Sequence, residues 1–277
     1  MFLEVLFKIM NIKSLGYRTD FIFNQYDGNV EDHGDYYVVT TKSNVNYFWG
    51  NLLLYKRPPR LGDIKTWKNA FKKELSDPRI YHKTFAWDSP DGSYGDPSEF
   101  ISEGFELDKS VVLTATSVGR PPKFNEDVSV KTLKTDEEFE KVIQIQVKCG
   151  GGQLSKDSWE GFYRLQLGQY KKMIAEGLGV WFAAYLDDKL VGSLGIFTDR
   201  EVGRFQIVST DPEYQRMGVC STLVYKSARY AFEKMNIETL VMVADEDYHA
   251  AKIYESVGFK STEKLVGLCW WDKSRHT

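Results

Sequence analysis

Cysteine and long apolar runs are scarce in this sequence, and each absence excludes a class of protein. The three cysteines, Cys149, Cys220 and Cys269, lie far apart, with neither metal-ligand spacing nor an even number for a disulfide framework. We therefore expect no metal site and a reducing, cytoplasmic location. No run of about eighteen apolar residues occurs, so we expect no membrane-spanning helix and no membrane partner.

An excess of basic residues is also missing. The net charge is −3 and the isoelectric point is about 5.9, whereas a dedicated nucleic-acid binder carries clustered Lys and Arg. We expect no nucleic-acid partner. Residues 1–10 are apolar but interrupted by Glu4 and Lys8, which favours an amphipathic strand or helix of the folded domain over a signal peptide.

The composition does support a sizeable core. Of the 277 residues, 42% are hydrophobic and 14% aromatic, enough for one large or two modest domains. The segment 121–127 is polar and contains two prolines, which is typical of a boundary. We therefore divide the chain into an N-terminal α/β domain, residues 1–124, and a second domain, residues 125–277.

One turn in the second domain has the pattern of an anion site. A strand-like run, residues 204–210, is followed by a polar turn, residues 211–221, and a helix-like run, residues 222–232. Free backbone N–H groups and the helix dipole favour negative charge at a helix start, so the turn predicts a bound phosphate group. The pattern is neither a dinucleotide fingerprint nor a P-loop, and a plain connection between strand and helix stays open.

The same turn resembles motif A of the GNAT superfamily of acetyl-CoA-dependent acyltransferases, written Gln/Arg-x-x-Gly-x-Gly/Ala. Gln215, Gly218 and Cys220 hold its three positions. Cys220 departs from the usual Gly or Ala but is also small. Its place in the cofactor turn makes it an unlikely nucleophile in a direct transfer.

A second segment, residues 247–259, resembles the family's motif B, an Asn-x-x-Ala-x-x-x-Tyr helix that ends in Gly-Phe. Asp247 replaces the usual Asn. The positions that match are Ala250, Tyr254, Gly258 and Phe259. Two motifs in the right order are more specific than either alone.

The resemblance implies a GNAT fold over about residues 125–272. This is an α/β (α+β) domain with a central mixed, mostly antiparallel sheet flanked by helices, in the order β-α-α-β-β-β-α-β-α-β. The hydrophobic pattern agrees with this order. Helices are expected at residues 137–147 and 159–174, the second capped by Asp157 or Ser158, a hairpin at 180–197, and strands at 239–244 and 263–271.

The first domain has a similar texture. Strands are expected at residues 35–41, 80–87 and 111–116, an aromatic-rich strand or bulge at 46–55, and an amphipathic helix at 64–75. Residues 100–105 echo residues 254–259, which suggests a degenerate, non-catalytic GNAT-like copy. Phe100 would then replace Tyr254, and the turn 57–63 would replace motif A. An unrelated α/β domain remains the alternative.

The resemblance also assigns the chemistry. It implies transfer of an acetyl group from acetyl-CoA, as co-substrate, to a primary amine of a small molecule or peptide. Tyr254 would be the general acid for the leaving thiolate. The residues expected at the cofactor are Val208, Thr210, Gln215, Arg216, Met217, Gly218, Val219, Cys220, Ser221 and Asp247.

Other functions stay open. The base is not identified, and Glu201, Asp245 and Glu246 are candidates beside a water chain. A CoA-binding sensor without turnover and an interaction protein with a vestigial phosphate turn are alternatives. The protein is expected to be a monomer or a homodimer.

Overall fold

The computed structural model describes residues 11–150, 155–247 and 250–276. Unit 1 comprises Met1–Val112 and Glu263–Arg275, and unit 2 comprises Leu113–Thr262 and His276–Thr277. Two strands belong to both units: β5 (Glu106–Ala115) begins in unit 1, and β11 (Lys260–Trp271) begins in unit 2. The expected boundary at 121–127 stays a prediction, and residues 1–10, expected to be amphipathic, lie outside the described residues.

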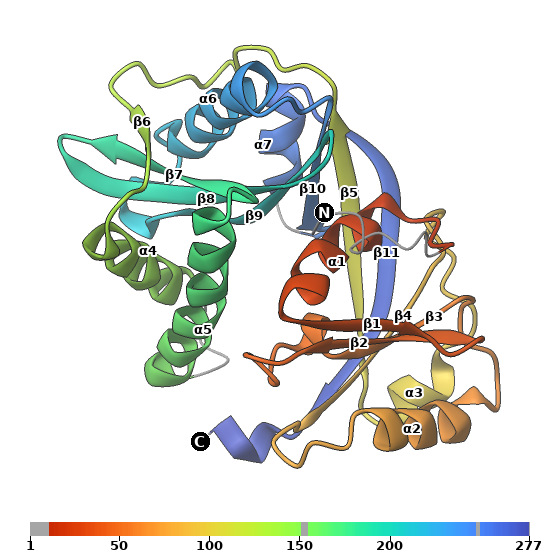
Figure 1. The fold of residues 1–277 in the computed structure, drawn as a ribbon. Coiled ribbons are helices and arrows are strands. Elements are labelled where there is room, and N and C mark those ends of the chain that lie inside the picture. Colours follow the sequence, from red (N-terminus) through yellow and green to blue (C-terminus); the bar gives the residue numbers. More distant parts are fainter. Residues whose placement is uncertain (1–10, 151–154, 248–249, 277) are drawn as a thin grey trace. The chain divides into compact units, whose positions relative to one another are not determined.

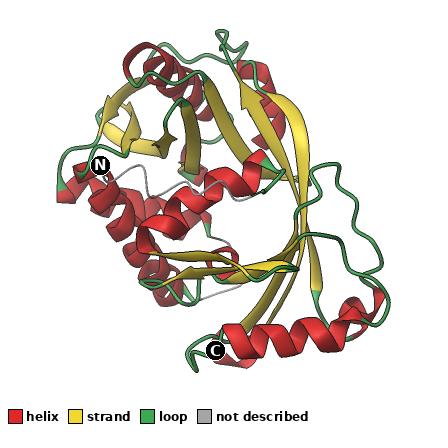
Figure 2. Ribbon diagram, turned by 45° about the vertical axis from the view of Figure 1, so that its right-hand side comes forward, coloured by secondary structure: helices red, strands yellow, loops and turns green. Residues whose placement is uncertain are grey.

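Unit 1 is a sheet with helices on both faces (Figures 1 and 2). Its strands, in sheet order, are β1 (Gly28–Asp32), β2 (Tyr36–Thr41), β3 (Leu52–Tyr55), β4 (His82–Trp87) and β11. Neighbouring strands are antiparallel, except that β3 and β4 are parallel. The helices are α1 (Leu15–Asp27) on one face and α2 (Asp63–Glu74) and α3 (Ser98–Ser102) on the other.

Helix α2 confirms the amphipathic helix expected at 64–75. Trp67, Phe71 and Leu75 form its buried stripe, each 7% exposed or less. The Trp67 ring stacks on that of Tyr55 in β3, with centroids 3.6 Å apart. This stripe joins the α2 layer to the sheet.

The strand or bulge expected at 46–55 is wrong in its first half. A 3-10 turn, η2 (Phe48–Gly50), precedes β3 instead. The cause is the Asn51 side chain: its Nδ2 donates to the carbonyls of Asn44 (3.0 Å) and Tyr47 (3.1 Å), and its Oδ1 accepts the N–H of Thr41 (2.9 Å). A side chain that binds the backbone in this way replaces strand pairing with a turn.

Unit 2 follows the order expected for residues 125–272 except at the last strand, because most of β11 lies in unit 1. Its strands, in sheet order, are β10 (Thr239–Asp245), β9 (Val202–Thr210), β8 (Lys189–Asp199), β7 (Gly179–Leu186) and β6 (Ser129–Thr132). All neighbours are antiparallel except β9 and β10. In Figure 1, α4 (Asp136–Cys149) and α5 (Lys156–Ala175) lie on one face of these strands, and α6 (Val219–Lys234) and α7 (Ala250–Val257) lie on the other.

Local signals explain most of these elements. Thr135 and Glu138 form a capping box at the start of α4. Asp187 and Asp188 both have positive φ, 49° and 59°, as a two-residue β7–β8 hairpin requires. The expected cap of α5 was wrong, because Ser155 lies at the N-cap and accepts the N–H of Ser158. None of the described helices combines the length and apolarity needed to cross a membrane.

Candidate functional site

Strands β9 and β10 pair briefly and then separate. Their parallel ladder ends at Arg204, opposite Val241. Strand β9 continues to Thr210 and β10 to Asp245. Among the described residues, the edge of β9 that faces β10 therefore has no strand partner from residue 205 to residue 210. Backbone groups on such an edge can bind a ligand that lies along the strand.

A β-bulge lies in the separated part of β9. Between Gln206 and Ser209, β9 carries one residue more than β8. Within it, Ile207 has a φ of 45°. A β-branched residue in this left-handed region costs about 1–3 kcal/mol, so the surrounding structure must hold it there. Val208, one of the expected cofactor residues, lies inside this bulge.

The chain after β9 forms a loop that ends in an uncapped helix. Asp211 accepts a backbone N–H of the short 3-10 helix η3 (Pro212–Tyr214) at 3.1 Å. Arg216 and Gly218 then adopt positive φ, 63° and 76°. Helix α6 begins at Val219, and its N-cap makes no side-chain hydrogen bond. Its first N–H groups can therefore hold an anion, as expected from the sequence.

The side chains of the loop divide into two groups. Gln215, Arg216 and Met217 are exposed, whereas Val219 and Ser221 are buried. The first three can therefore meet a ligand with their side chains. The last two can offer only backbone groups.

The segment expected to link two domains packs against this loop. The Ser221 hydroxyl donates to the Lys123 carbonyl at 2.7 Å, and Asn125 Nδ2 donates to the Met217 carbonyl at 2.8 Å. A Cβ atom at Gly218 would lie 2.5 Å from the Lys123 carbonyl oxygen. Gly218 is therefore required by packing and by its backbone conformation, before any ligand is considered.

Two thiols lie near the end of β9. Burial raises the pKa of the Cys220 thiol to about 12, so this group is neutral at physiological pH and a poor nucleophile. The Cys149 thiol, at the end of α4, donates to the Thr210 carbonyl at 3.4 Å.

Motif B ends in a Schellman cap. The Phe259 N–H donates to the Tyr254 carbonyl (3.2 Å) and the Gly258 N–H to the Glu255 carbonyl (3.0 Å), with Gly258 at a φ of 119°. The Tyr254 and Phe259 rings lie 6.5 Å apart, which is the hydrophobic contact of this motif. Gly-Phe therefore stops helix α7 and brings the Tyr254 ring against that of Phe259.

Ring contacts lead from Tyr254 through Phe259 to the residue where β9 and β10 part. Tyr254 is 6% exposed. The Phe259 ring lies 5.7 Å from that of Phe205, the first residue of β9 beyond the ladder. Asp247 lies just before α7, where its N–H donates to the Asp245 carboxylate (2.8 Å). Tyr248 and His249, also in motif B, lie outside the described residues.

Of the three candidate bases, Glu201 is at the wrong end of the sheet. It precedes β9, where β9 and β10 are paired, and its carbonyl accepts the N–H groups of Glu238 and Thr239. Asp245 is the last residue of β10 and Glu246 follows it, at the end of the sheet where β9 enters the loop, because parallel strands share their carboxyl edge.

Unit 1 repeats the cap of motif B. The Phe105 N–H donates to the Phe100 carbonyl and the Gly104 N–H to the Ile101 carbonyl, both at 3.0 Å, with Gly104 at a φ of 86°. The sequence echo between residues 100–105 and 254–259 is therefore a repeated Schellman cap. Phe100 stands in the place of Tyr254, and it has no hydroxyl.

Unit 1 differs from unit 2 at the strands and at the loop. The β3–β4 ladder reaches Tyr55, the last residue of β3, so these strands do not part. Before α2, carboxylates of the chain itself take the loop N–H groups: Glu99 accepts from Gly62 (2.7 Å), and Asp63 accepts from Arg60 (2.8 Å). The anion positions of this loop are thus filled internally.

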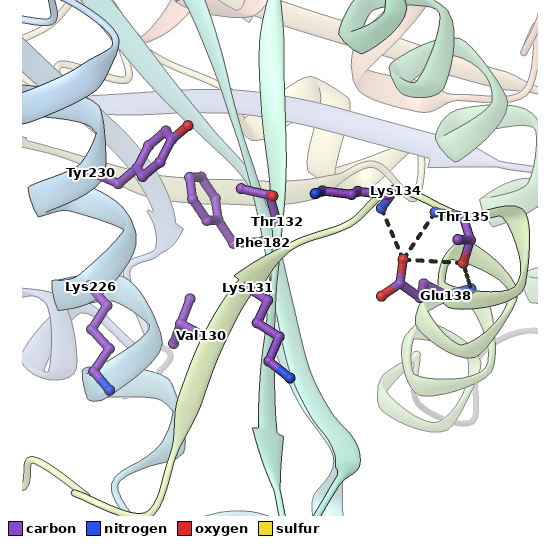
Figure 3. A pocket seen from close by; sticks show the side chains of 9 residues that line it. All are labelled: Val130, Lys131, Thr132, Lys134, Thr135, Glu138, Phe182, Lys226 and Tyr230. Carbon is purple, nitrogen blue, oxygen red and sulfur yellow. Dashed lines mark hydrogen bonds between the residues drawn. The ribbon is translucent and has the colours of Figure 1, made fainter.

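A depression of about 570 Å³ lies elsewhere in unit 2, along the edge strand β6. Figure 3 shows Lys226 and Tyr230 of α6 on one side of β6 and Thr135 and Glu138 of α4 on the other. Backbone hydrogen bonds at the start of α4 lower the pKa of Glu138 to about 2. The depression lies beside β6, a short edge strand that carries Lys131. Short edge strands and lysines on them commonly protect a sheet against pairing with other strands, and this accounts for the residues here without a ligand.

Comparison with known proteins agrees with this geometry. The model of the acetyltransferase (GNAT) family matches residues 141–259, which include the bulge, the loop and α7. These residues form a GNAT domain. The comparison with curated proteins gave no match.

Solved structures extend the likeness to both units. A functionally unknown conserved protein from Staphylococcus epidermidis has a TM-score of 0.69 at 15% identity, covering 89% of this chain and 95% of its own. A GCN5-related N-acetyltransferase from Kribbella flavida has a TM-score of 0.63 at 12% identity, covering 91% and 93%. A tandem GNAT protein from the clavulanic acid biosynthesis pathway has a TM-score of 0.51 at 13% identity, covering 79% and 73%.

At these identities the likeness concerns the fold. Unit 1 is GNAT-like because β2-β3-α2-β4-α3-β5 repeats the order β8-β9-α6-β10-α7-β11, with a parallel pair at the same place. The expected tandem of GNAT-like halves is confirmed at the level of fold.

Sequence reasoning missed three contacts that shape the site. Lys123 and Asn125 were read as part of a linker, and Gln146 as part of an apolar helix face. The signal for Gln146 was weak, because it is one of two amides, with Gln144, that alternate with apolar residues in 143–147.

Gly218→Ala should destabilise the protein more than Gly177→Ala. Both glycines have a positive φ, 76° and 78°, but a Cβ at Gly177 meets no atom within 4 Å. Gly177→Ala should cost about 1 kcal/mol of unfolding free energy, and Gly218→Ala should cost more because of the Lys123 carbonyl. Urea denaturation measures both, and equal losses would contradict the packing role of Gly218.

Proposed function

We propose that this protein transfers an acetyl group from acetyl-CoA to a primary amine of a small molecule or peptide. One observation carries the proposal: β9 runs without a β10 partner from residue 205 to residue 210 and then enters a loop with an uncapped helix start. The gap between β9 and β10 beyond Arg204, called the fork below, leaves the edge of β9 unpaired for an extended amide chain. The loop offers N–H groups for a pyrophosphate. Membership of residues 141–259 in the GNAT family supports it.

The cofactor would lie along β9 and end at the loop. Backbone groups of Val208 and Thr210 would pair with the pantetheine arm, and the N–H groups of the loop from Gln215 to Ser221 would bind the pyrophosphate. Exposed Arg216 would add a charge-assisted bond to a phosphate. Asp247, at the start of α7, would contact the cofactor from the other side of the fork.

The transfer would be direct, in a ternary complex. The amine nitrogen attacks the thioester carbon, the carbon–sulfur bond breaks, and the sulfur leaves with the electron pair. The Tyr254 hydroxyl gives its proton to this sulfur, and the amine loses a proton to water. A phenol and a thiol have ordinary pKa values of about 10 and about 8.5, so this transfer is close to balanced. A backbone N–H in the bulge, at Val208, would stabilise the carbonyl oxygen.

Met217→Glu should weaken acetyl-CoA binding about tenfold or more, because a carboxylate on the loop repels the pyrophosphate. Met217 is 47% exposed, and a carboxylate near a helix start does not harm the helix, so the fold should be kept. Isothermal titration calorimetry measures the affinity, and Met217→Gln is the uncharged control. Equal affinity of the Glu and Gln variants would place the pyrophosphate elsewhere.

Tyr254→Phe should lower kcat about 10²–10⁴-fold and leave the affinity for CoA unchanged, because only the proton donor is removed. Tyr230→Phe, on the exposed side of α6, is the control. Release of CoA thiol with a panel of primary amines measures turnover. Unchanged kcat would rule out the acid role of Tyr254. CoA binding by wild type without turnover of any amine would favour a sensor.

Each chain should bind one acetyl-CoA. Unit 2 has the fork and the open loop, whereas in unit 1 the strands stay paired and Glu99 and Asp63 fill the loop. Calorimetry should give a stoichiometry of one, and Met217→Glu should weaken that single event. A second event that persists in Met217→Glu would show that unit 1 also binds the cofactor.

A further inference from the structure

A buried side-chain amide of helix α4 binds the β9 bulge. Gln146 of α4 is 2% exposed, and its Nε2 donates to the Ile207 carbonyl at 3.1 Å and to the Ser209 hydroxyl at 2.8 Å. The Ser209 hydroxyl lies 3.4 Å from that of Ser193, which is fully buried. A buried polar side chain is kept only where its hydrogen bonds are made, so this amide is committed to the bulge.

The bulge needs such support because its backbone is strained. Ile207 has a φ of 45°, a region that β-branched residues avoid. Regular pairing with β8 stops at Gln206 and resumes at Ser209, so the ladder itself does not hold the two residues between them. Gln146 binds on both sides of Val208, at the carbonyl before it and at the side chain after it.

We propose that Gln146 is a positioning residue for acetyl transfer. It fixes the bulge and thereby the direction of the Val208 backbone at the thioester. This inference rests on the proposed function. Gln146 does not touch the reacting atoms; it acts through Ile207 and Ser209.

Unit 2 offers a matched control for this role. Gln166 of α5 is also 2% exposed and also makes a buried hydrogen bond, from its Nε2 to the Tyr170 hydroxyl at 2.6 Å. It does not contact β9 through that bond. Gln146→Leu and Gln166→Leu thus remove equally buried amides from neighbouring helices, one with two hydrogen bonds and one with a single bond, and only the first removes the support of the bulge.

The experiment compares the two variants in the full chain. Gln146→Leu should lower kcat about 10- to 100-fold and leave the dissociation constant of CoA within threefold of wild type. Gln166→Leu should leave kcat within threefold, and urea denaturation measures how much stability each variant loses. Equal effects of both variants on kcat would overturn the proposal, because Gln146 would then be only a core residue.

A second substitution separates positioning from stability. Glycine adopts a positive φ without strain, so Ile207→Gly lets the bulge form with less support. Adding Ile207→Gly to Gln146→Leu should raise kcat at least tenfold, or back to the wild-type value if the loss was less than tenfold. The stability in urea should not be restored. A double variant no more active than Gln146→Leu would overturn the proposal. Wild type that binds no CoA and acetylates no amine would instead refute the proposed function itself.

Discussion

The ladder between β9 and β10 ends at Arg204, and the candidate site depends on this early end. A parallel pair that continued would satisfy the backbone groups of residues 205–210 within the sheet and leave nothing for a ligand. Unit 1 shows that case, because β3 and β4 stay paired to the end of β3. The two halves share a fold and a connection between parallel strands, yet only one of them has an open edge.

The family motifs separate into residues that fold the chain and groups left for chemistry. Gly218 is required by a left-handed backbone and by the Lys123 carbonyl, and Gly258-Phe259 forms the stop of α7. Unit 1 keeps the same helix stop with Phe100 and has no hydroxyl there. The proposed chemistry uses other groups, the loop N–H groups and the hydroxyl of Tyr254, so one half can stay GNAT-like in fold with Phe100 in the place of that tyrosine.

Local patterns predicted the elements that local interactions form. The apolar stripe of Trp67, Phe71 and Leu75 gave α2, and the Asp187-Asp188 turn belongs to the β7–β8 hairpin. Helix α1 was missed although Ser14 caps it locally, with its hydroxyl accepting the Tyr17 N–H. Distant carboxylates also hold its N-terminus: Glu263 accepts the N–H of Leu15 and the hydroxyl of Ser14, and Asp88 accepts the N–H of Ser14. These distant partners leave no trace in the neighbouring sequence.

The sequence by itself determined the likeness of the second half to the GNAT family and the order of its elements, and it predicted the anion loop and the tyrosine, since these depend on residue types at fixed spacing. Only the tertiary structure decided where β9 leaves β10, that Lys123 packs on the loop, and that Gln146 supports the bulge at Ile207. The Lys123 and Gln146 contacts are hydrogen bonds between backbone and side chains some 60 to 100 residues apart. A spacing pattern cannot encode them, because the partners meet only after the sheet and its helices have packed.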